Sequence, residues 1–255
     1  MKAGIREIMI ITTPHDQAAF QHLLGDGKAW GIDITWAVQP NPDGLAQALI
    51  IAEEFLGGAP SALILGDNLF FGAEFDKALT AANHNTTKNQ SRATVFGYHV
   101  RNPEAYGVAN INTDNKIIGI EEKPKNPKSN YAITGLYLYD GNAPKYAKTI
   151  KPSKRKELEI TSLNQIYLDR GQLKCVLLGE GTTWLDTGTH KSLLRAAEFV
   201  HVVEERQGRR ICCPEVIAYR QGWISKKDIL KLAKPLKKSG YGEYILRIAN
   251  SLSLE

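Results

Sequence analysis

The sequence contains little that would tie it to a membrane or to an oxidising compartment. No stretch approaches the roughly 18 consecutive apolar residues of a membrane-spanning helix, and the first residues lack the layout of a secretory signal peptide. The three cysteines, Cys175, Cys212 and Cys213, are odd in number, have no metal-ligand spacing and include an adjacent pair. These features argue against a membrane protein and against a disulfide framework, and they predict a cytoplasmic chain with reduced thiols.

Low-complexity segments and internal repeats are also absent, and the excess of one charge is modest. A formal charge of +5 and a pI near 9.0 would suit anionic partners. The lysines are spread along helix-like segments, however, and do not form one stripe with interleaved aromatic residues, so nucleic-acid binding is not favoured. The simplest interpretation of residues 151–156 and 226–238 is that they form solvated faces.

What the sequence does contain is enough apolar material for a folded core. A chain of 255 residues with 43% hydrophobic residues can form one α/β domain, or two small ones. We expect a single domain over residues 1–205, followed by a helical tail over residues 206–255.

The most informative run, residues 62–68, consists of four apolar residues, a glycine, an acid and an amide. A short apolar run before a turn is typical of a strand that is covered on both faces, as in a parallel sheet flanked by helices. Open α/β sheets bind ligands at the carboxyl ends of their strands, so we expect Asp67 in a cleft, where its carboxylate would suit Mg²⁺. The alternative is that Asp67 only caps the next helix or turn.

A second acid repeats this pattern. Residues 183–189 read Thr-Trp-Leu-Asp-Thr-Gly-Thr, which places Asp186 at a strand end before a helix-like stretch. Two carboxylates at two strand ends can share one metal ion. Helix capping is again the alternative, and Thr187 or Thr189 could fill that role equally well.

Apolar periodicity predicts a strand–helix–strand rhythm at the start of the chain, which is typical of a parallel sheet. The expected elements are strands at 5–12, 35–38 and 62–65 and helices at 17–24, 44–55 and 74–83, followed by an exposed loop at 85–92. A β-rich part has strands at 93–100, 108–112, 116–121 and 131–139, and then come a helix at 157–169, a strand at 173–178 and helices at 190–205, 226–233 and 242–252. Ser225 and Asp228 predict the cap of the helix at 226–233, and Pro235 predicts its end.

Seven motifs together resemble the glucose-1-phosphate thymidylyltransferases, a family of sugar nucleotidyltransferases, over nearly the whole chain. The motifs are QPNPDGLAQA at 39–48, LGDN at 65–68, YGV at 106–108, EEKP at 121–124, NYAITGLY at 130–137, ELEIT at 157–161 and WLDTGT at 184–189. The tail segment from Glu204 to Glu215 is also similar to this family. Because these motifs occur in the order of the family, the resemblance is specific.

The resemblance implies an α/β fold with a mainly parallel, Rossmann-like sheet flanked by helices, a β-rich sugar-binding part and a helical C-terminal tail. The implied activity is nucleotidyl transfer from dTTP to glucose 1-phosphate, giving dTDP-glucose and pyrophosphate for dTDP-rhamnose and lipopolysaccharide synthesis. A homotetramer and the cofactor Mg²⁺ are implied as well. Asp67 and Asp186 would hold the metal ion, which neutralises charge that develops on the phosphates.

For the nucleotide, the resemblance assigns Gln39, Pro42, Gly44 and Leu45 in addition to Asp67. The Gln39 amide carries a donor and an acceptor and can read the imide edge of thymine, while Gly44 lets the backbone approach the base. The alternative for residues 39–40 is a simple exit from a strand.

For the sugar phosphate, the resemblance assigns Lys123 and Arg155, whose positive charges would face the phosphate. The sugar pocket would be formed by Tyr106, Gly107, Glu122, Lys123, Ile133, Tyr137 and Trp184. Other interpretations stay open, because Lys123 and Glu122 could be a surface ion pair, and Tyr137 and Trp184 could be core aromatics.

The chain departs from the family at its start. The family begins with a strand and a loop of the form G-G-x-G-T-R-L, followed by a lysine that holds phosphates, whereas Met1–Gly4 aligns with the end of the first family helix. Lys156 stands where the family more often has glycine. We expect residues 1–255 as given to be inactive or nearly so, since losing one preorganised donor costs about 10²-fold to 10³-fold. Three alternatives follow: an active enzyme that starts upstream, a truncated remnant that binds without catalysis, and an interaction protein that joins full-length relatives.

Overall fold

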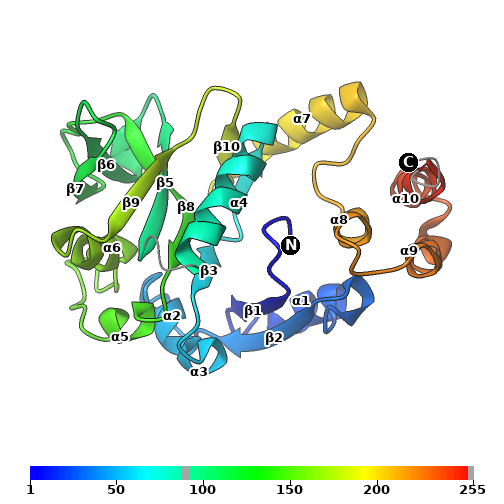
Figure 1. Ribbon diagram of the computed structural model, residues 1–255, viewed down its shortest axis with the longest axis horizontal. Coiled ribbons are helices and arrows are strands. Elements are labelled where there is room, and N and C mark those ends of the chain that lie inside the picture. The colour runs from blue at the N-terminus through cyan, green and yellow to red at the C-terminus, as the bar shows by residue number, and fades with distance from the viewer. Residues whose placement is uncertain (88–91, 252–255) are drawn as a thin grey trace. The chain divides into compact units, whose positions relative to one another are not determined.

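The computed structural model describes residues 1–87 and 92–251, and its contacts divide the chain into two units (Figure 1). One unit comprises Asn41–Leu193, and the other comprises Met1–Pro40 together with Leu194–Glu255. Strands and helices alternate along the chain, which confirms the α/β class expected from the apolar periodicity. The expected domain boundary at residue 205 stays a prediction.

The unit of residues 41–193 is built on a six-stranded sheet. Five of its strands follow the order β7–β6–β8–β5–β9, and the sixth, β3, pairs with β8. Its strands are β3 (Ser61–Ile64), β5 (Ala93–His99), β6 (Gly107–Ile111), β7 (Ile117–Glu122), β8 (Tyr131–Tyr139) and β9 (Leu173–Leu177). The pairing of β5 with β9 is parallel, whereas β3–β8, β5–β8, β6–β8 and β6–β7 are antiparallel. The sheet is therefore mixed, which corrects the expectation of a mainly parallel sheet. For β6 and β7 the physical reason is that the turn between them is too short for a parallel crossover. The other antiparallel pairings arise because β8 runs opposite to β3, β5 and β6.

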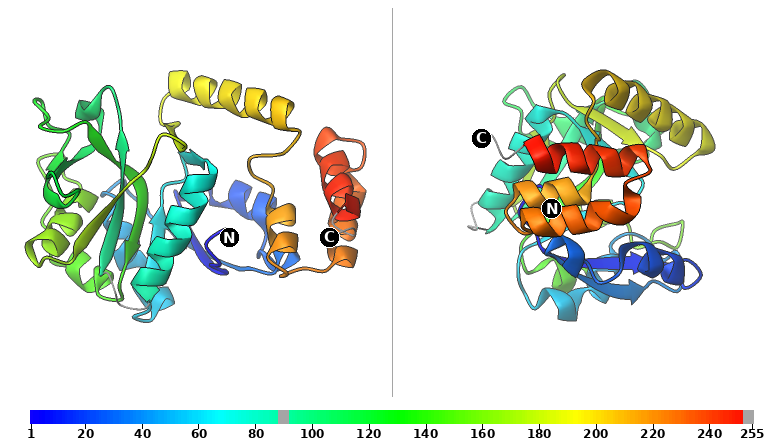
Figure 2. Two further views of the ribbon diagram at one scale, coloured as in Figure 1. Left: turned by 45° about the horizontal axis from the view of Figure 1, so that its top comes forward. Right: turned by 90° about the vertical axis from the view of Figure 1, so that its right-hand side faces the viewer.

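Helices cover both faces of this sheet (Figures 1 and 2). They are α2 (Gln47–Ile51), α3 (Glu53–Leu56), α4 (Ala73–Thr87), α5 (Ala143–Ala147) and α6 (Ile160–Asp169). On one face, Phe75 of α4 packs in a cluster with Leu138 of β8. On the other face, Tyr167 of α6 packs in a cluster with Tyr139 of β8. Since β8 is covered from both sides, it is the strand with the most completely buried sequence.

β3 differs from its prediction as a strand covered on both faces. Ala62 and Ile64 lie on the same side of β3 and are both exposed, Ile64 by 56%. β3 pairs antiparallel with β8, and no other pairing is recorded for it among the described strands. The apolar run therefore marks an edge strand, because the central position in the sheet is taken by β8.

Two short strands outside this sheet form an antiparallel pair. They are β4 (Asn68–Phe71) and β10 (Thr183–Asp186), and they are joined over residues 68–71 and 183–186. Helix α7 (His190–Gln207) begins four residues after β10. β4 was not predicted, because its apolar residues directly follow a turn and are too few to show a period.

The unit formed by both ends of the chain contains a parallel pair of strands and a cluster of helices. β1 (Glu7–Thr12) pairs with β2 (Asp33–Val38), and α1 (Gln17–Leu24) and the 3-10 helix η1 (Lys28–Trp30) lie between them in the chain. Helices α8 (Pro214–Arg220), α9 (Lys226–Ala233) and α10 (Gly240–Ser251) pack around Ile229 and Ile245 (Figure 2, right). The remaining short elements of the chain are the 3-10 helices η2 (Pro103–Ala105) and η3 (Lys234–Leu236).

Several predicted elements match the structure closely. The bounds of α1, β8 and α9 are those predicted, and Ser225 and Asp228 form the expected reciprocal cap of α9. The helix expected over 44–55 is divided into α2 and α3, because Ala52 has a ψ of 0° that interrupts the helical geometry. The loop expected over 85–92 is in part helical, since α4 extends through residue 87, and residues 88–91 lie outside the described residues, as does residue 252.

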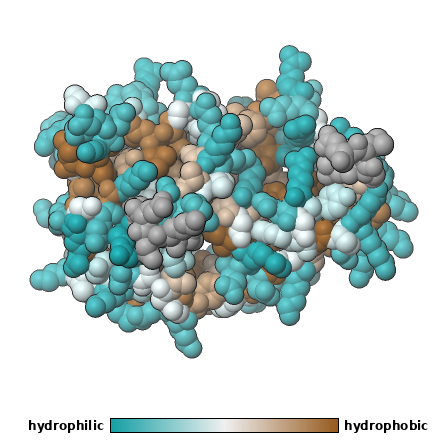
Figure 3. Space-filling model, viewed as in Figure 1, coloured by the Kyte–Doolittle hydropathy of each residue, from teal (hydrophilic) through white to brown (hydrophobic). Residues whose placement is uncertain are grey.

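Among the described residues, no helix is both long and apolar enough to cross a membrane. The face in Figure 3 is mostly hydrophilic, with smaller apolar areas between the polar side chains. Lys151, Lys154, Lys226 and Lys227 are exposed, which confirms that the predicted lysine groups form solvated faces.

Candidate functional site

The two predicted acids lie together at the pair of short strands. Asp67 is in the turn between β3 and β4, and Asp186 is the last residue of β10. The register of β4 and β10 places Asp186 opposite Asn68. Thr187 then donates from its backbone N–H and from Oγ1 to the Asp67 carbonyl oxygen, at 2.8 and 2.9 Å. The backbone therefore holds the two strand ends side by side.

The side chains of both acids face the same glycine. A Cβ atom at Gly188 would lie 3.1 Å from Oδ1 of Asp186 and 3.4 Å from Oδ2 of Asp67. The Gly188 N–H also donates to Asp186 Oδ1 at 2.8 Å. Because glycine carries no side chain, the space between the two carboxylates stays open on this side. Oxygens from both acids can therefore reach one ligand.

The donor set at this point fits Mg²⁺. Within residues 1–87 and 92–251, no group of three or more His, Cys, Asp and Glu side chains could enclose a metal ion. The acid pair therefore offers two carboxylates, and Mg²⁺ usually keeps several waters and binds through one or two carboxylates plus substrate phosphates. Asp67 is exposed and Asp186 is half-buried, so phosphate oxygens could complete the coordination.

Asn68 was not predicted as a site residue, and its side chain connects this acid pair to the sheet. Nδ2 donates to Asp67 Oδ1 at 2.7 Å, while Oδ1 accepts from the Gly135 N–H at 2.9 Å and from Trp184 Nε1 at 2.7 Å. The motif at residues 65–68 contains Asn68, but no local signal shows that its partners come from β8 and β10.

A second group of predicted residues surrounds Glu122 at the end of β7. The β6–β7 register places Gly107 opposite Glu122, and Thr161 of α6 donates from Oγ1 to Glu122 Oε2. A Cβ at Gly107 would lie 3.3 Å from Thr161 Oγ1 and 3.7 Å from Glu122 Oε2, so glycine leaves room for this contact. Burial, and then the charge of Glu122, raise the pKa of Tyr137.

Arg155 lies in the same group, and its charge is shared by glutamates. Its Nη2 is 2.8 Å from Glu159, 3.4 Å from Glu157 and 3.4 Å from Glu122. Ser153 Oγ also donates to Glu159 at 2.7 Å. Burial opposes ionisation of Glu159, but the hydrogen bonds from Arg155 and Ser153 outweigh it and lower the pKa of Glu159. In this structure the guanidinium is thus already paired, and its contact with a sugar phosphate stays a prediction.

Lys123 has an unusual backbone conformation beside this group. Its φ is 41°, in the left-handed region that few residues other than glycine adopt. Its N–H donates to the Tyr106 carbonyl oxygen at 3.1 Å, and its side chain is exposed. Such a backbone is held by its surroundings, here by the hydrogen bond to Tyr106 beside the β6–β7 pair.

Aromatic side chains link the acid pair to the rest of the predicted site. Trp184 packs edge-on against Tyr106, with ring centroids 5.1 Å apart, and against Tyr98 at 5.8 Å. Burial, and then the charge of Asp186, raise the pKa of Tyr106. Tyr106 and Trp184 therefore lie beside the acids. Trp184 is itself 7% exposed, and Tyr137 and Ile133, at 4% and 7%, are part of the main buried cluster. The core alternative is therefore confirmed for both Tyr137 and Trp184.

The predicted nucleotide-binding segment is fixed by a close backbone crossing. Gly44 has a φ of +104°, and a Cβ there would lie 2.4 Å from the Leu158 nitrogen. Glycine is thus required for packing, independently of any contact with a base. Leu45 packs against the core and Pro42 is exposed. Gln39 directly follows β2 in the other unit, and its reading of the base stays a prediction.

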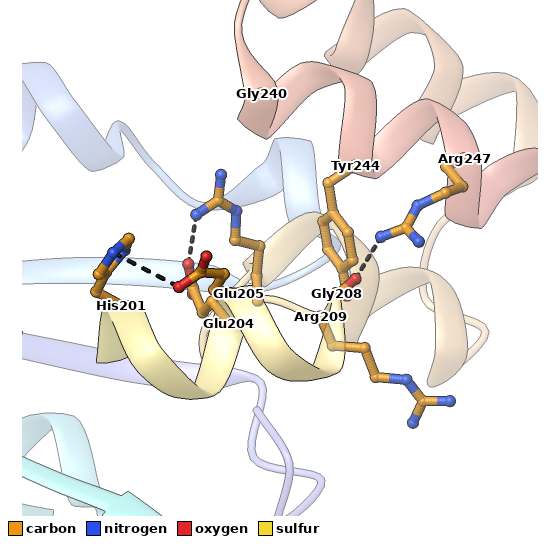
Figure 4. Close-up of a pocket in the computed structure, with 9 residues that line it drawn as sticks. His201, Glu204, Glu205, Gly208, Arg209, Gly240, Tyr244 and Arg247 are labelled. Atoms are coloured by element: carbon orange, nitrogen blue, oxygen red, sulfur yellow. Dashed lines mark hydrogen bonds and ion pairs between the residues drawn. The ribbon is translucent and has the colours of Figure 1, made fainter. Parts of the chain in front are cut away.

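A cavity of about 280 Å³ in the other unit contains none of the predicted site residues (Figure 4). It is lined by residues of α7, of α10 and of the segment 208–210 that follows α7. Glu204 pairs with Arg210, and Arg247 donates to the Gly208 carbonyl oxygen. In Figure 4 the Arg209 side chain points away from Tyr244 and Arg247. His201 Nε2 lies 3.9 Å from Glu205 Oε2, so two of the cavity's acids each lie beside a basic side chain.

Comparisons with known proteins agree with these features. The nucleotidyl transferase family model matches residues 1–202. A glucose-1-phosphate thymidylyltransferase of Xanthomonas campestris pv. campestris is 55% identical over 249 residues, which cover 98% of this chain and 83% of that protein. The enzyme of the same name from Neisseria meningitidis is 51% identical over 248 residues, covering 97% of this chain and 85% of that protein.

Solved structures show the same fold. A crystal structure of a Bacillus anthracis protein assigned as a glucose-1-phosphate thymidylyltransferase, in complex with a sucrose, is 42% identical, with a TM-score of 0.70 over 78% of this chain and 77% of that chain. A UDP-glucose pyrophosphorylase with bound UDP-glucose is 21% identical, with a TM-score of 0.68 over 79% of this chain and 82% of that chain, and supports the fold alone. This chain belongs to the nucleotidyl transferases and, within them, to the glucose-1-phosphate thymidylyltransferases.

Proposed function

We propose that this protein transfers a thymidylyl group from dTTP to glucose 1-phosphate and releases pyrophosphate, forming dTDP-glucose. The relatives that share about half of its residues carry the name of this activity. The observation that carries the proposal is the convergence of the Asp67 and Asp186 carboxylates at Gly188.

The reaction forms one phosphorus–oxygen bond and breaks another. A phosphate oxygen of glucose 1-phosphate attacks the α-phosphorus of dTTP, and the bond from that phosphorus to the pyrophosphate oxygen breaks. Such transfers depend on positioning and on stabilisation of negative charge. Asp67 and Asp186 would hold Mg²⁺, which when bound neutralises charge on the phosphates. The backbone bonds from Thr187 to Asp67 keep the two carboxylates in place before substrate binds.

Glu122 is the proposed acceptor for sugar hydroxyls. Thr161 already occupies one side of its Oε2 atom, which fixes the orientation of the carboxylate. Gly107 keeps the space above Glu122 free of a side chain. Tyr106, which packs against the buried Trp184, would form an aromatic wall, a surface that suits the apolar face of a sugar ring. Lys123, which is exposed, would supply positive charge to the sugar phosphate.

For the nucleotide, we propose that the Gln39 amide reads the imide edge of thymine. The amide group offers one acceptor and two donors, which match the N–H and carbonyl groups of the base. Gly44 and Leu45 are also proposed to bind the nucleotide, because the backbone crossing at Leu158 fixes their position within the unit of residues 41–193.

Pyrophosphate release with glucose 1-phosphate and dTTP, in the presence of Mg²⁺, tests the proposal. The expectation that residues 1–255 by themselves are nearly inactive stays a prediction, and the rate of the unaltered chain in the same assay tests it. We expect Asp67→Asn and Asp186→Asn each to lower kcat/KM by about 10²-fold or more, since each removes a negative charge that would hold the metal ion. Asp114→Asn is the matched control, because Asp114 is exposed in the turn between β6 and β7. Unchanged rates in the two acid variants would contradict the site. Turnover with UTP above that with dTTP would contradict the assignment of the base.

A further inference from the structure

The Asn68 side chain has a single orientation that satisfies its partners. Its Oδ1 accepts from two N–H donors, the Gly135 backbone at 2.9 Å and Trp184 Nε1 at 2.7 Å. If the amide were rotated by half a turn, its NH₂ group would face both donors, and three donors would meet without an acceptor. The NH₂ group is therefore directed to Asp67, whose Oδ1 accepts from it at 2.7 Å.

β8 is shaped to receive this side chain. A Cβ at Gly135 would lie 2.6 Å from Asn68 Oδ1 and 2.7 Å from its Cγ, so any other residue there would displace the amide. The register of β4 with β10 also fixes the Asn68 backbone opposite Asp186. Asn68 is thus held by three separate strands, β4, β8 and β10.

The two oxygens of Asp67 consequently differ in their surroundings. Oδ1 is occupied by the Asn68 amide, whereas Oδ2 is the oxygen that lies toward Gly188 and Asp186. A carboxylate with one oxygen fixed keeps the other in a constant direction. Groups that orient a ligand in this way typically change metal affinity by about 10-fold to 100-fold when they are removed.

We propose that Asn68 is a positioning residue that directs Asp67 Oδ2 to the cation site and makes that direction depend on the Trp184 indole. This inference rests on the cation site of the proposed function. Because Trp184 also packs against Tyr106, the wall of the sugar pocket and the cation site share one hydrogen-bonded group. Loss of the indole N–H removes one of the two donors to Asn68 Oδ1, leaves the amide held by Gly135 alone and thereby loosens Asp67.

Binding of Mn²⁺ alone, followed by electron paramagnetic resonance of the free ion, tests this without turnover. We expect Asn68→Ala to raise the Mn²⁺ dissociation constant about 10-fold or more. Trp184→Phe keeps the ring but loses the donor, and we expect a rise of about threefold. The double variant should bind no more weakly than Asn68→Ala, because the indole acts through Asn68.

Two matched controls separate this role from general effects. Asn142→Ala removes an amide that donates to Asp140 Oδ2 at 2.9 Å, and Trp36→Phe removes an indole donor to the Gly25 carbonyl oxygen at 3.2 Å. Both should bind Mn²⁺ as the unaltered protein does. If Asn68→Ala does not fold, the Mn²⁺ dissociation constant of the Trp184→Phe variant by itself tests whether the hydrogen bond to Asn68 supports the cation site.

The outcomes distinguish the inference from the function on which it rests. An unaltered protein that fails to bind Mn²⁺ would overturn the cation site, and the positioning role with it. Normal Mn²⁺ binding in the unaltered protein, together with unchanged binding in Asn68→Ala and Trp184→Phe, would overturn the positioning role alone. Independent, additive effects of the two substitutions would overturn the dependence on the indole.

Discussion

The charged group around Arg155 shows how single residues affect the stability of the folded state at low pH. The pKa of Glu159 lies below its ordinary value, because hydrogen bonds from Arg155 and Ser153 and the charge of Arg155 outweigh the effect of burial. A carboxyl group with a lowered pKa stabilises the folded state at neutral pH. This contribution is fully present above the unfolded-state value of about 4.3 and is lost as the pH falls through the lower folded-state value.

We therefore expect Glu159→Gln to lower Tm at pH 7 and to have a progressively smaller effect as the pH falls below the unfolded-state value of about 4.3 and through the lowered pKa of folded Glu159. Thermal unfolding of both proteins between pH 3 and pH 7 measures this difference. Glu157→Gln is the control, since Glu157 is 3.4 Å from Arg155 and its side chain is 36% exposed, so its effect should be smaller. A Tm difference that does not change with pH would show that Glu159 acts through packing.

Lys156 occupies a backbone position that suits glycine. Its φ of 64° is left-handed, and its N–H closes a turn by donating to the Ser153 carbonyl oxygen at 2.9 Å. We expect Lys156→Gly to raise the free energy of unfolding by up to about 1 kcal/mol, because strain at Cβ is removed. Urea unfolding measures it. Lys154→Gly, which replaces a neighbouring lysine without a positive φ, should destabilise instead, and stabilisation by both substitutions would contradict the argument.

At the scale of elements, the structure assigns the core to a different strand from the one the apolar run indicated. Leu138 of β8 is 1% exposed, whereas Ile64 of β3 is 56% exposed. We expect Leu138→Ala to cost about 2–5 kcal/mol, since it leaves a cavity between the sheet and α4. Ile64→Ala should change stability by no more than about 0.5 kcal/mol. Chemical unfolding of the two variants tests this, and equal losses would mean that β3 is covered in solution.

Element boundaries were predictable where local chemistry sets them. The cap formed by Ser225 and Asp228 is local, and α9 begins and ends as its sequence indicates. The direction of strand pairing is not local, because it depends on which segments meet after the chain turns. Residues 131–139 were identified as a strand, but their place between β3, β5 and β6 was not.

At the scale of the whole molecule, association of several copies stays a prediction from the family resemblance. Ile118, Leu194 and Val202 are each more than half exposed in the single chain, and association would cover apolar surface of this kind. We expect light scattering coupled to size-exclusion chromatography to give a mass near four times the 28.2 kDa of one chain. A mass equal to one chain at micromolar concentration would contradict the homotetramer.

Some residues of the site could be identified from the sequence, and others only from the structure. Asp67 and Asp186 were identified from their positions after apolar runs, and Glu122, Lys123 and Gly107 were identified from family motifs. Asn68 was overlooked because an amide shows no role until its partners are known, and these come from Gly135 and Trp184 on distant strands. The pairing of Arg155 with three glutamates was likewise not visible in the order of residues.

The sequence by itself determined the α/β class, most of the helices and strands, the two acids and the family, because these depend on periodicity, caps and motifs that lie within short segments. Tertiary structure alone decided that the sheet is mixed, that β8 and not β3 is its buried centre, and that the two acids meet at Gly188. The reason is physical: a strand's partners and a side chain's neighbours are set by packing between segments far apart in the chain, and no local pattern encodes that choice.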